Sequence, residues 1–162
     1  TSGDLAIAGT AWELGRPCVV LANKWDLLDD ERREEFDTSW ERLAEILSEP
    51  RRINISALTG RSVQKIFPAV AETLEATNIE LGTADLNRLI DELTRRHQPP
   101  VVHGQDWRVL YATQVKKQPP TFMLFANRKL ARQSSYRRYL ENGIRRALGL
   151  SGIPLRLVIR ER

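Results

Sequence analysis

The first half of the chain combines apolar runs with apolar residues spaced three and four apart. Residues 18–22 form a continuous apolar run that stops at polar residues, as a fully buried strand of a parallel sheet does. Residues 51–55 are a second predicted strand, and the spacing over 30–48 and 63–74 predicts amphipathic helices. Residues 5–15 are a short helix-like run that ends at Gly15. Because strands and helices alternate, we expect an α/β fold with a parallel sheet and flanking helices.

The two longer helices of this half are predicted to have one apolar face each. In the helix over 30–48 that face is formed by Phe36, Trp40, Leu43, Ala44 and Leu47. In the last helix it is formed by Val63, Ile66, Phe67, Val70, Ala71 and Leu74. Pro68 lies inside this last helix and lacks a backbone N–H, so a kink or a frayed first turn is expected.

The second half of the chain follows a different order of elements. Five are predicted: a helix over 83–98, strands over 106–115 and 121–127, a helix over 134–148 and a strand over 153–162. Thr83 is the expected cap of the first helix, and Pro99 and Pro100 end it. The order helix–strand–strand–helix–strand resembles the α+β KH fold of RNA-binding proteins.

KH domains hold the RNA backbone with a Gly-x-x-Gly loop between two helices. Gly149 and Gly152 have this spacing but lead into a strand, so we interpret them as a helix cap and a turn. The stretch 127–135, where the loop would lie, contains no glycine. Tyr136 and Tyr139 are expected in the core, and no exposed aromatic pair is evident, so RNA would be bound mainly through charge.

Charge is divided unequally between the halves. Residues 1–80 hold nine Lys and Arg against fifteen Asp and Glu, a net charge of −6, whereas residues 81–162 hold sixteen against six, a net charge of +10. This asymmetry predicts two domains, 1–80 and 81–162, and makes the basic one a candidate for nucleic acid. A merely solvated basic surface is the alternative.

Within the basic half, five cations are candidates for binding RNA or for docking the acidic half: Arg128, Lys129, Arg132, Arg137 and Arg138.

Composition limits the remaining classes of protein. The single cysteine, Cys18, excludes an internal disulfide, which fits a reducing cytoplasm. No apolar run approaches the roughly 20 residues that a membrane-spanning helix needs. His97 and His103 have no metal-ligand spacing, and no catalytic residue or metal ligand is predicted. We therefore expect a cytoplasmic monomer with no membrane partner.

Polar residues follow each strand of the acidic half, where α/β folds place their ligands. The two loops offer six candidates for binding guanine: Asn23, Lys24, Asp26, Ser56 and, through their backbone N–H groups, Ala57 and Leu58. The Asp26 carboxylate can accept two parallel hydrogen bonds from the ring N–H and amino group of guanine. Lys24 can lie along the base, and the Asn23 amide can tie the two loops together. The pair Asn-Lys-x-Asp and Ser-Ala-x-x-Gly resembles the base-recognition motifs of translation-factor-class GTPases.

The phosphate-binding parts of a GTPase are missing from the sequence. There is no Gly-x-x-x-x-Gly-Lys-Ser/Thr loop and no Asp-x-x-Gly beside which magnesium could bind. Because these motifs precede the base-recognition motifs in GTPases, we expect the chain to be the rear part of a longer protein, inactive by itself. An RNA- or ribosome-binding module, or a protein-interaction adaptor, with an inert α/β lobe is the alternative.

Four stretches extend the resemblance to the whole chain: DLAIAGTAWELGRPCVVLANKWDLL, SALTG, YATQV…PPTFMLFAN and YRRYLENGIRRALGLSGIPLRLVIRER. Together they resemble the C-terminal part of the Der (EngA) family, bacterial ribosome-assembly GTPases with two G domains and a KH-like domain. The resemblance implies the tail of the second G domain followed by the KH-like domain. It also implies GTP and GDP binding, magnesium in the intact protein, and partners in the large ribosomal subunit, its rRNA and the upstream G domains.

Overall fold

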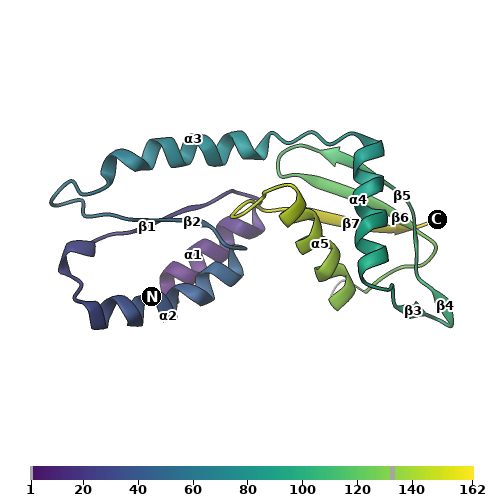
Figure 1. The fold of residues 1–162 in the computed structure, drawn as a ribbon, viewed down its shortest axis with the longest axis horizontal. Helices are drawn as coiled ribbons and strands as arrows, with labels where there is room; N and C mark the ends of the chain where they lie inside the picture. The colour runs from purple at the N-terminus through teal and green to yellow at the C-terminus, as the bar shows by residue number, and fades with distance from the viewer. Residues whose placement is uncertain (1, 132–133) are drawn as a thin grey trace. The chain divides into compact units, whose positions relative to one another are not determined.

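The computed structural model describes residues 2–131 and 134–162, which divide into two compact units (Figure 1). The first unit comprises residues 1–77 with 151–154, and the second comprises residues 78–150 with 155–162. The sequence predicts segment 151–154 as part of the second half, but it belongs to the first unit. Within the described chain, none of the helices combines the length and apolarity that crossing a membrane requires.

The first unit is a small α/β arrangement. Its elements are α1 (Ser2–Glu13), β1 (Val19–Ala22), the 3-10 turn η1 (Trp25–Leu27), α2 (Asp30–Ile46), β2 (Arg51–Asn54), the 3-10 turn η2 (Val63–Lys65) and α3 (Ile66–Thr77). Strands β1 and β2 pair in parallel, with Val19 opposite Arg51 and Ala22 opposite Asn54. The predicted parallel sheet with flanking helices is therefore confirmed.

Capping and side-chain spacing explain why α2 forms where it does. The Asp29 carboxylate accepts a hydrogen bond from the backbone N–H of Arg32 at 3.0 Å, which satisfies one of the free donors of the first turn. The predicted apolar face is confirmed, because Leu47 is buried and Phe36 and Trp40 are half-buried.

Two predictions for this unit were wrong. Strand β1 is only partly covered, and Leu21 is 40% exposed. On α3, Phe67 and Leu74 of the predicted buried face are 83% and 54% exposed, while Ala69 on another side is buried. The described sheet has two strands, so it offers α3 too little apolar surface to cover the whole stripe. Pro68 lies in the first turn of α3, directly after η2, as the expected irregular start requires.

The second unit has the predicted α+β order. Its elements are α4 (Thr83–Arg96), β3 (Val101–Val102), β4 (Gln105–Asp106), β5 (Val109–Lys116), β6 (Thr121–Ala126), α5 (Ser135–Ala147) and β7 (Arg156–Glu161). The main sheet has the order β5-β6-β7, antiparallel between β5 and β6 and parallel between β6 and β7. Helix α4 begins after Gly82 rather than with Thr83 as its cap.

The β3–β4 hairpin was missed because each strand has only two residues. The sequence feature that could have predicted the hairpin is the dipeptide His103-Gly104, at which the chain turns with φ angles of 50° and 75°. Two consecutive residues with positive φ are what a tight two-residue hairpin requires.

The core of the second unit lies between one face of this sheet and the helices α4 and α5. Leu86, Ile90, Leu140 and Ile144 from the helices are at most 1% exposed. They pack with residues from all three strands of the main sheet: Ala112, Phe122, Leu124 and Leu157. Burying one such aliphatic side chain contributes roughly 1.5–3 kcal/mol, so this layer sets the arrangement of helices and sheet.

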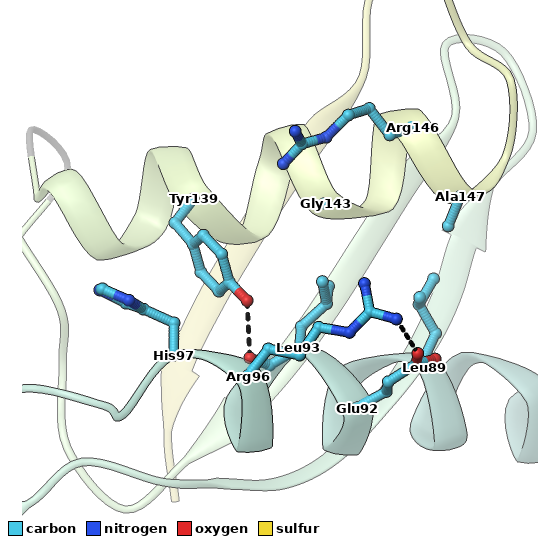
Figure 2. Close-up of a pocket in the computed structure, with 9 residues that line it drawn as sticks. All are labelled: Leu89, Glu92, Leu93, Arg96, His97, Tyr139, Gly143, Arg146 and Ala147. Atoms are coloured by element: carbon cyan, nitrogen blue, oxygen red, sulfur yellow. Dashed lines mark hydrogen bonds and ion pairs between the residues drawn. The ribbon is translucent and has the colours of Figure 1, made fainter.

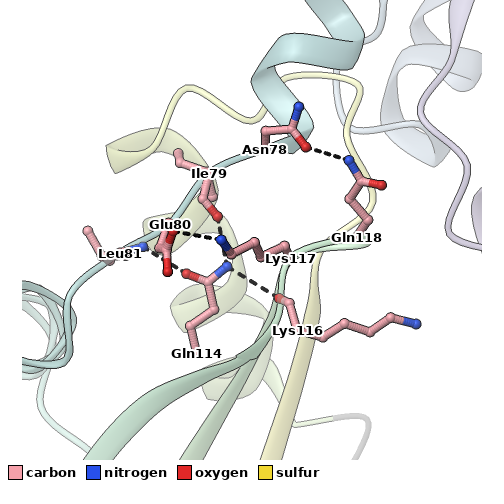
Figure 3. A network of polar contacts seen from close by, with 8 residues as sticks. All are labelled: Asn78, Ile79, Glu80, Leu81, Gln114, Lys116, Lys117 and Gln118. Atoms are coloured by element: carbon pink, nitrogen blue, oxygen red, sulfur yellow. Dashed lines mark hydrogen bonds and ion pairs between the residues drawn. The ribbon is translucent and has the colours of Figure 1, made fainter.

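The segment that enters the second unit is held to the end of β5 (Figure 3). The Gln114 carboxamide accepts a hydrogen bond from the backbone N–H of Leu81 at 2.8 Å and donates one to the carbonyl of Ile79 at 2.8 Å. An ion pair between Lys117 and Glu80, with an N–O distance of 2.7 Å, lies beside it. Residues 79–81 therefore belong structurally to the second unit.

Candidate functional site

The two loops predicted to bind guanine lie side by side at the carboxyl ends of β1 and β2. The Ile55 N–H donates to the carbonyl of Ala22 at 2.9 Å, and the Trp25 N–H donates to the carbonyl of Ile55 at 3.0 Å. The backbone ladder of the parallel pair thus continues past the strands into the loops. This is the edge of an α/β sheet where ligands are usually bound.

Asn23 joins the loops through its side chain. Its Oδ1 accepts hydrogen bonds from the backbone N–H of Lys24 at 2.8 Å and of Ala57 at 3.0 Å. The predicted tie between the loops is therefore confirmed. Since the oxygen receives both bonds, the amide nitrogen of Asn23 is left to face a ligand.

Lys24 and Asp26 flank the start of η1. Lys24 adopts a left-handed backbone conformation, with φ 63° and ψ 30°, which is uncommon for a residue other than glycine. Asp26 is exposed, and its carboxylate makes no hydrogen bond or ion pair with the described residues. Both of its oxygens are thus available to accept from a ligand.

Ser56 shapes the second loop from inside. It is fully buried, its Oγ accepts from the N–H of Thr59 at 3.2 Å, and its own N–H donates to the carbonyl of Arg61 at 3.1 Å. Gly60 completes the turn with a φ of 77°. Leu58 is 90% exposed, and within the described chain its backbone N–H has no partner. Ser56 therefore fixes the loop, while the Leu58 backbone can meet a ligand.

Trp25, the free position of the Asn-Lys-x-Asp motif, is a packing residue. It is 8% exposed, and its ring meets Phe36 edge-on with ring centroids 5.5 Å apart. The Arg52 guanidinium lies 5.8 Å from the Trp25 ring and forms an ion pair with Asp37 at 2.6 Å. These contacts anchor η1, and with it Asp26, to α2 and β2.

Neither metal nor redox chemistry is suggested by the side chains present. Among the residues that the structure describes, no three His, Cys, Asp or Glu side chains gather closely enough to hold a metal ion. Burial raises the pKa of the Cys18 thiol, which makes it less reactive rather than more.

The cations predicted to meet RNA differ in their availability. Arg137 bonds to Glu141 at 3.1 Å and to the carbonyl of Leu157, so it ties α5 to β7. Arg128 donates to Gln105 at 3.0 Å and pairs with Glu161 at 3.3 Å.

Lys129 and Arg138 are exposed, and neither side chain has a partner among the described residues. Arg132 lies outside the described residues. Among the described members of the predicted set, Lys129 and Arg138 are thus the cations without a partner.

A pocket of about 620 Å³ opens between α4 and α5 (Figure 2). A Cβ on Gly143 would lie 2.5 Å from Cδ2 of Leu93, so the glycine lets the helices approach closely. Tyr139 donates to the Leu93 carbonyl at 2.8 Å, and Tyr136 donates to the His97 carbonyl at 3.0 Å. Burial, with a smaller effect of Tyr139, raises the pKa of Tyr136 to about 12. The predicted core role is confirmed for Tyr136, whereas Tyr139 is half-buried and packs against the core at the edge of the pocket.

One partly exposed aromatic pair was not predicted from the sequence. Tyr111 on β5 and Phe125 on β6 are direct partners in the antiparallel register, and their rings stack with centroids 4.8 Å apart and planes 9° apart. Tyr111 is 36% exposed. Phe125 is half-buried, so the pair is partly exposed. Strand alternation could have placed each ring opposite the helices, but only the register brings the two together.

Comparison with known proteins agrees with this architecture. Residues 81–160 match the family described as the KH-domain-like C-terminal domain of EngA bacterial GTPase enzymes. This stretch is therefore similar to a KH-like domain, and the predicted fold class, an α/β part followed by an α+β KH-like part, is confirmed. The chain was also matched to a crystal structure of Aquifex aeolicus Era bound to GDP and aluminium fluoride. The match covers 92% of this chain and 56% of the Era chain, at 13% identity. Its TM-score of 0.28 is too low to support an argument.

Over its whole length the chain is similar to GTPase Der. It is 40% identical to GTPase Der of Mycobacterium ulcerans and 39% identical to that of Mycobacterium tuberculosis over all 162 residues. It is 40% identical to GTPase Der of Parvibaculum lavamentivorans over 98% of its length. The chain spans about a third of the length of these relatives, 34–35% in the first two. The resemblance to the C-terminal portion of Der is confirmed.

Proposed function

We propose that this chain is the C-terminal part of a cytoplasmic GTP-binding and GTP-hydrolysing factor for assembly of the large ribosomal subunit. In this proposal residues 1–80 end a G domain and recognise guanine, and residues 81–162 are a KH-like domain that meets ribosomal RNA. The observation that carries it is the hydrogen bond from Ala57 to Asn23, because it joins the two base-recognition loops. The names of the similar proteins, GTPase Der and EngA, support the same reading.

Each candidate residue has a role in this site. Asp26 accepts from the ring N–H and the amino group of guanine, and the backbone N–H of Leu58 donates to its carbonyl oxygen. The methylenes of Lys24 cover one face of the base. Asn23, Ser56 and Ala57 hold the loops in place, and the Asn23 amide nitrogen is free to donate to the base. A site built on such paired hydrogen bonds rejects bases that lack the matching groups.

The surface of the first unit supports the proposal that a longer G domain surrounds it. Phe67, Ile7 and Leu14 are 83%, 74% and 67% exposed, so the two helices α1 and α3 both carry large apolar side chains that the described unit leaves uncovered. In the longer protein, further strands of the sheet would cover them. The phosphate- and magnesium-binding residues would also lie there, since magnesium bridges the phosphates and stabilises charge in the transition state of hydrolysis.

Catalysis should therefore require the longer protein. We expect the 162-residue chain to bind guanine nucleotides very weakly and to show no GTP hydrolysis above background, because phosphate contacts contribute much of the affinity. Calorimetric titration with GDP and a phosphate-release assay measure both. Turnover by a preparation of this chain free of other GTPases would contradict the proposal.

Base recognition is tested by Asp26→Asn in the longer protein. An amide pairs with only one of the two guanine donors, so we expect GTP affinity to fall by about 2–4 kcal/mol. The affinity for xanthosine triphosphate should rise, because the amide of the variant can donate a hydrogen bond to the extra carbonyl of xanthine. Steady-state hydrolysis of both nucleotides gives the change in preference, and Glu31→Gln, which removes a charge from an exposed position on α2, is the control. Unchanged preference in the Asp26 variant would mean that this carboxylate does not face the base.

A further inference from the structure

The sheet of the second unit has one face that its helices leave open. Ala112 and Leu124 are register partners that point into the core beneath α4 and α5. Tyr111 and Phe125, each one residue along the strand, therefore point to the opposite face, because side chains alternate along a strand. We call this surface the open sheet face and define it by Tyr111, Lys116, Met123, Phe125, Arg156 and Arg160.

The registers place these residues in rows across three strands. Phe125 pairs with Tyr111 on one side and with Arg160 on the other, so a stacked aromatic pair lies beside a guanidinium. In the next row, Met123 pairs with Val158. In the third row Thr121 lies between Lys116 and Arg156. Apolar rings and side chains thus form the middle of the face, and cations stand at both ends.

The charge on this face is of one sign. Lys116, Arg156 and Arg160 are exposed, and no Asp or Glu belongs to the rows. Within the described chain, the ammonium of Lys116 and the guanidinium of Arg160 have no hydrogen-bond or ion-pair partner. The two unpaired cations, Lys116 and Arg160, lie beside an apolar centre, and this combination favours a partner that is both anionic and flat.

We propose that the open sheet face binds single-stranded RNA by stacking bases on Tyr111 and Phe125 and by pairing phosphates with Arg160, Arg156 and Lys116. Two nearly parallel rings form a stack that a nucleobase can continue, and every base has a flat face to offer. An acidic protein surface would satisfy the cations but not the exposed rings. The choice of RNA over DNA rests on the proposed ribosomal function.

Fluorescence anisotropy of the 162-residue chain with a labelled oligoadenylate of about ten nucleotides tests this binding. Tyr111→Leu and Phe125→Leu keep apolar bulk but remove a ring, and we expect each to weaken binding roughly 5- to 150-fold, the range of about 1–3 kcal/mol per stacked base. Tyr111→Phe keeps the ring and should bind as the wild type does. Arg160→Gln should lower the dependence of log affinity on log salt by about 0.7, the contribution of one phosphate.

Circular dichroism and thermal melting confirm the fold of each variant, and ultraviolet crosslinking of the unmodified chain to the same RNA locates the contact without any substitution. Crosslinks on peptides that contain Tyr111 or Phe125 support the proposal. Binding that is unchanged in both leucine variants overturns it, as do crosslinks confined to other peptides. If the double variant Lys129→Glu and Arg138→Glu abolishes binding while the leucine variants do not change it, the proposal for the open sheet face is wrong but RNA binding by the chain stands. If the unmodified chain binds no RNA, the RNA-binding part of the proposed function fails as well.

Discussion

A single carboxamide oxygen, that of Asn23, connects two loops that lie 34 residues apart in the chain. It accepts from the backbone of both loops, so its removal leaves two N–H groups without a protein partner. The Asp26 and Leu58 groups proposed to meet guanine are held by the backbone of these loops. Asn23 thus acts by positioning, while Asp26 is left free to bind.

Replacing Asn23 with alanine should loosen both loops. We expect the free energy of local opening to fall by about 1 kcal/mol, the typical net value of such hydrogen bonds at an exposed site. Backbone hydrogen exchange measured by NMR should then speed up roughly fivefold at Lys24 and Ala57. Asn23→Asp keeps an acceptor oxygen and should preserve the protection. Equal protection in the alanine variant would show that the loops hold together without this side chain.

At the scale of elements, α3 and the segment before α4 show that neighbouring elements decide which residues are buried or held in place. The stripe of apolar residues on α3 is amphipathic by sequence, yet much of it is exposed in the described unit. The segment 79–81 has no secondary structure, yet Gln114 and Lys117 of the second unit bond to it directly. Gln118 bonds to the neighbouring Asn78. In this chain a helix can therefore form without burying its apolar face, and a segment can be held in place without forming a helix or strand.

Gln114→Leu should release this segment. Leucine has nearly the same length but cannot replace the two hydrogen bonds to Ile79 and Leu81, so we expect exchange of the Leu81 N–H to rise about tenfold. Limited proteolysis should then cut residues 78–82 faster. Lys117→Ala removes an exposed ion pair worth at most about 1 kcal/mol and should change little. A segment that stays protected in Gln114→Leu would mean that its apolar contacts are sufficient.

At the scale of the whole molecule, the division of charge is the dominant feature. The net charges of −6 and +10 on the two halves fit a nucleotide-binding unit joined to a unit that meets a polyanion. Several of the basic side chains are nevertheless used internally, as Arg137 and Arg128 show. Net charge thus indicates the class of partner but overstates the number of cations available to it.

RNA binding by the chain should weaken steeply as salt is raised. Each phosphate neutralised contributes about −0.7 to the slope of log affinity against log salt for a single strand. Reversing Lys129 and Arg138 to glutamate should weaken binding to all RNA sequences alike, since phosphate contacts carry no sequence information. Filter binding at several salt concentrations measures both effects. A shallow slope would favour the rival in which the basic face docks the acidic G domains.

The sequence by itself determined the order of the longer elements, the two-part organisation and which residues form the loops after β1 and β2. These follow from local rules: the spacing of apolar residues, the end of a strand run, and short motifs whose chemistry is contained in four or five neighbours. The hairpin β3–β4 was missed for the same reason, since two-residue strands carry almost no pattern.

Only the tertiary structure decided which side chains are free to act. Arg137 and Arg138 are neighbours in sequence, but α5 turns one toward Glu141 and the Leu157 carbonyl and leaves the other exposed. Tyr111 and Phe125 are 14 positions apart in the chain, and the register of β5 and β6 alone makes them a stacked pair. Availability and pairing depend on contacts between elements distant in sequence, and no local pattern contains that information.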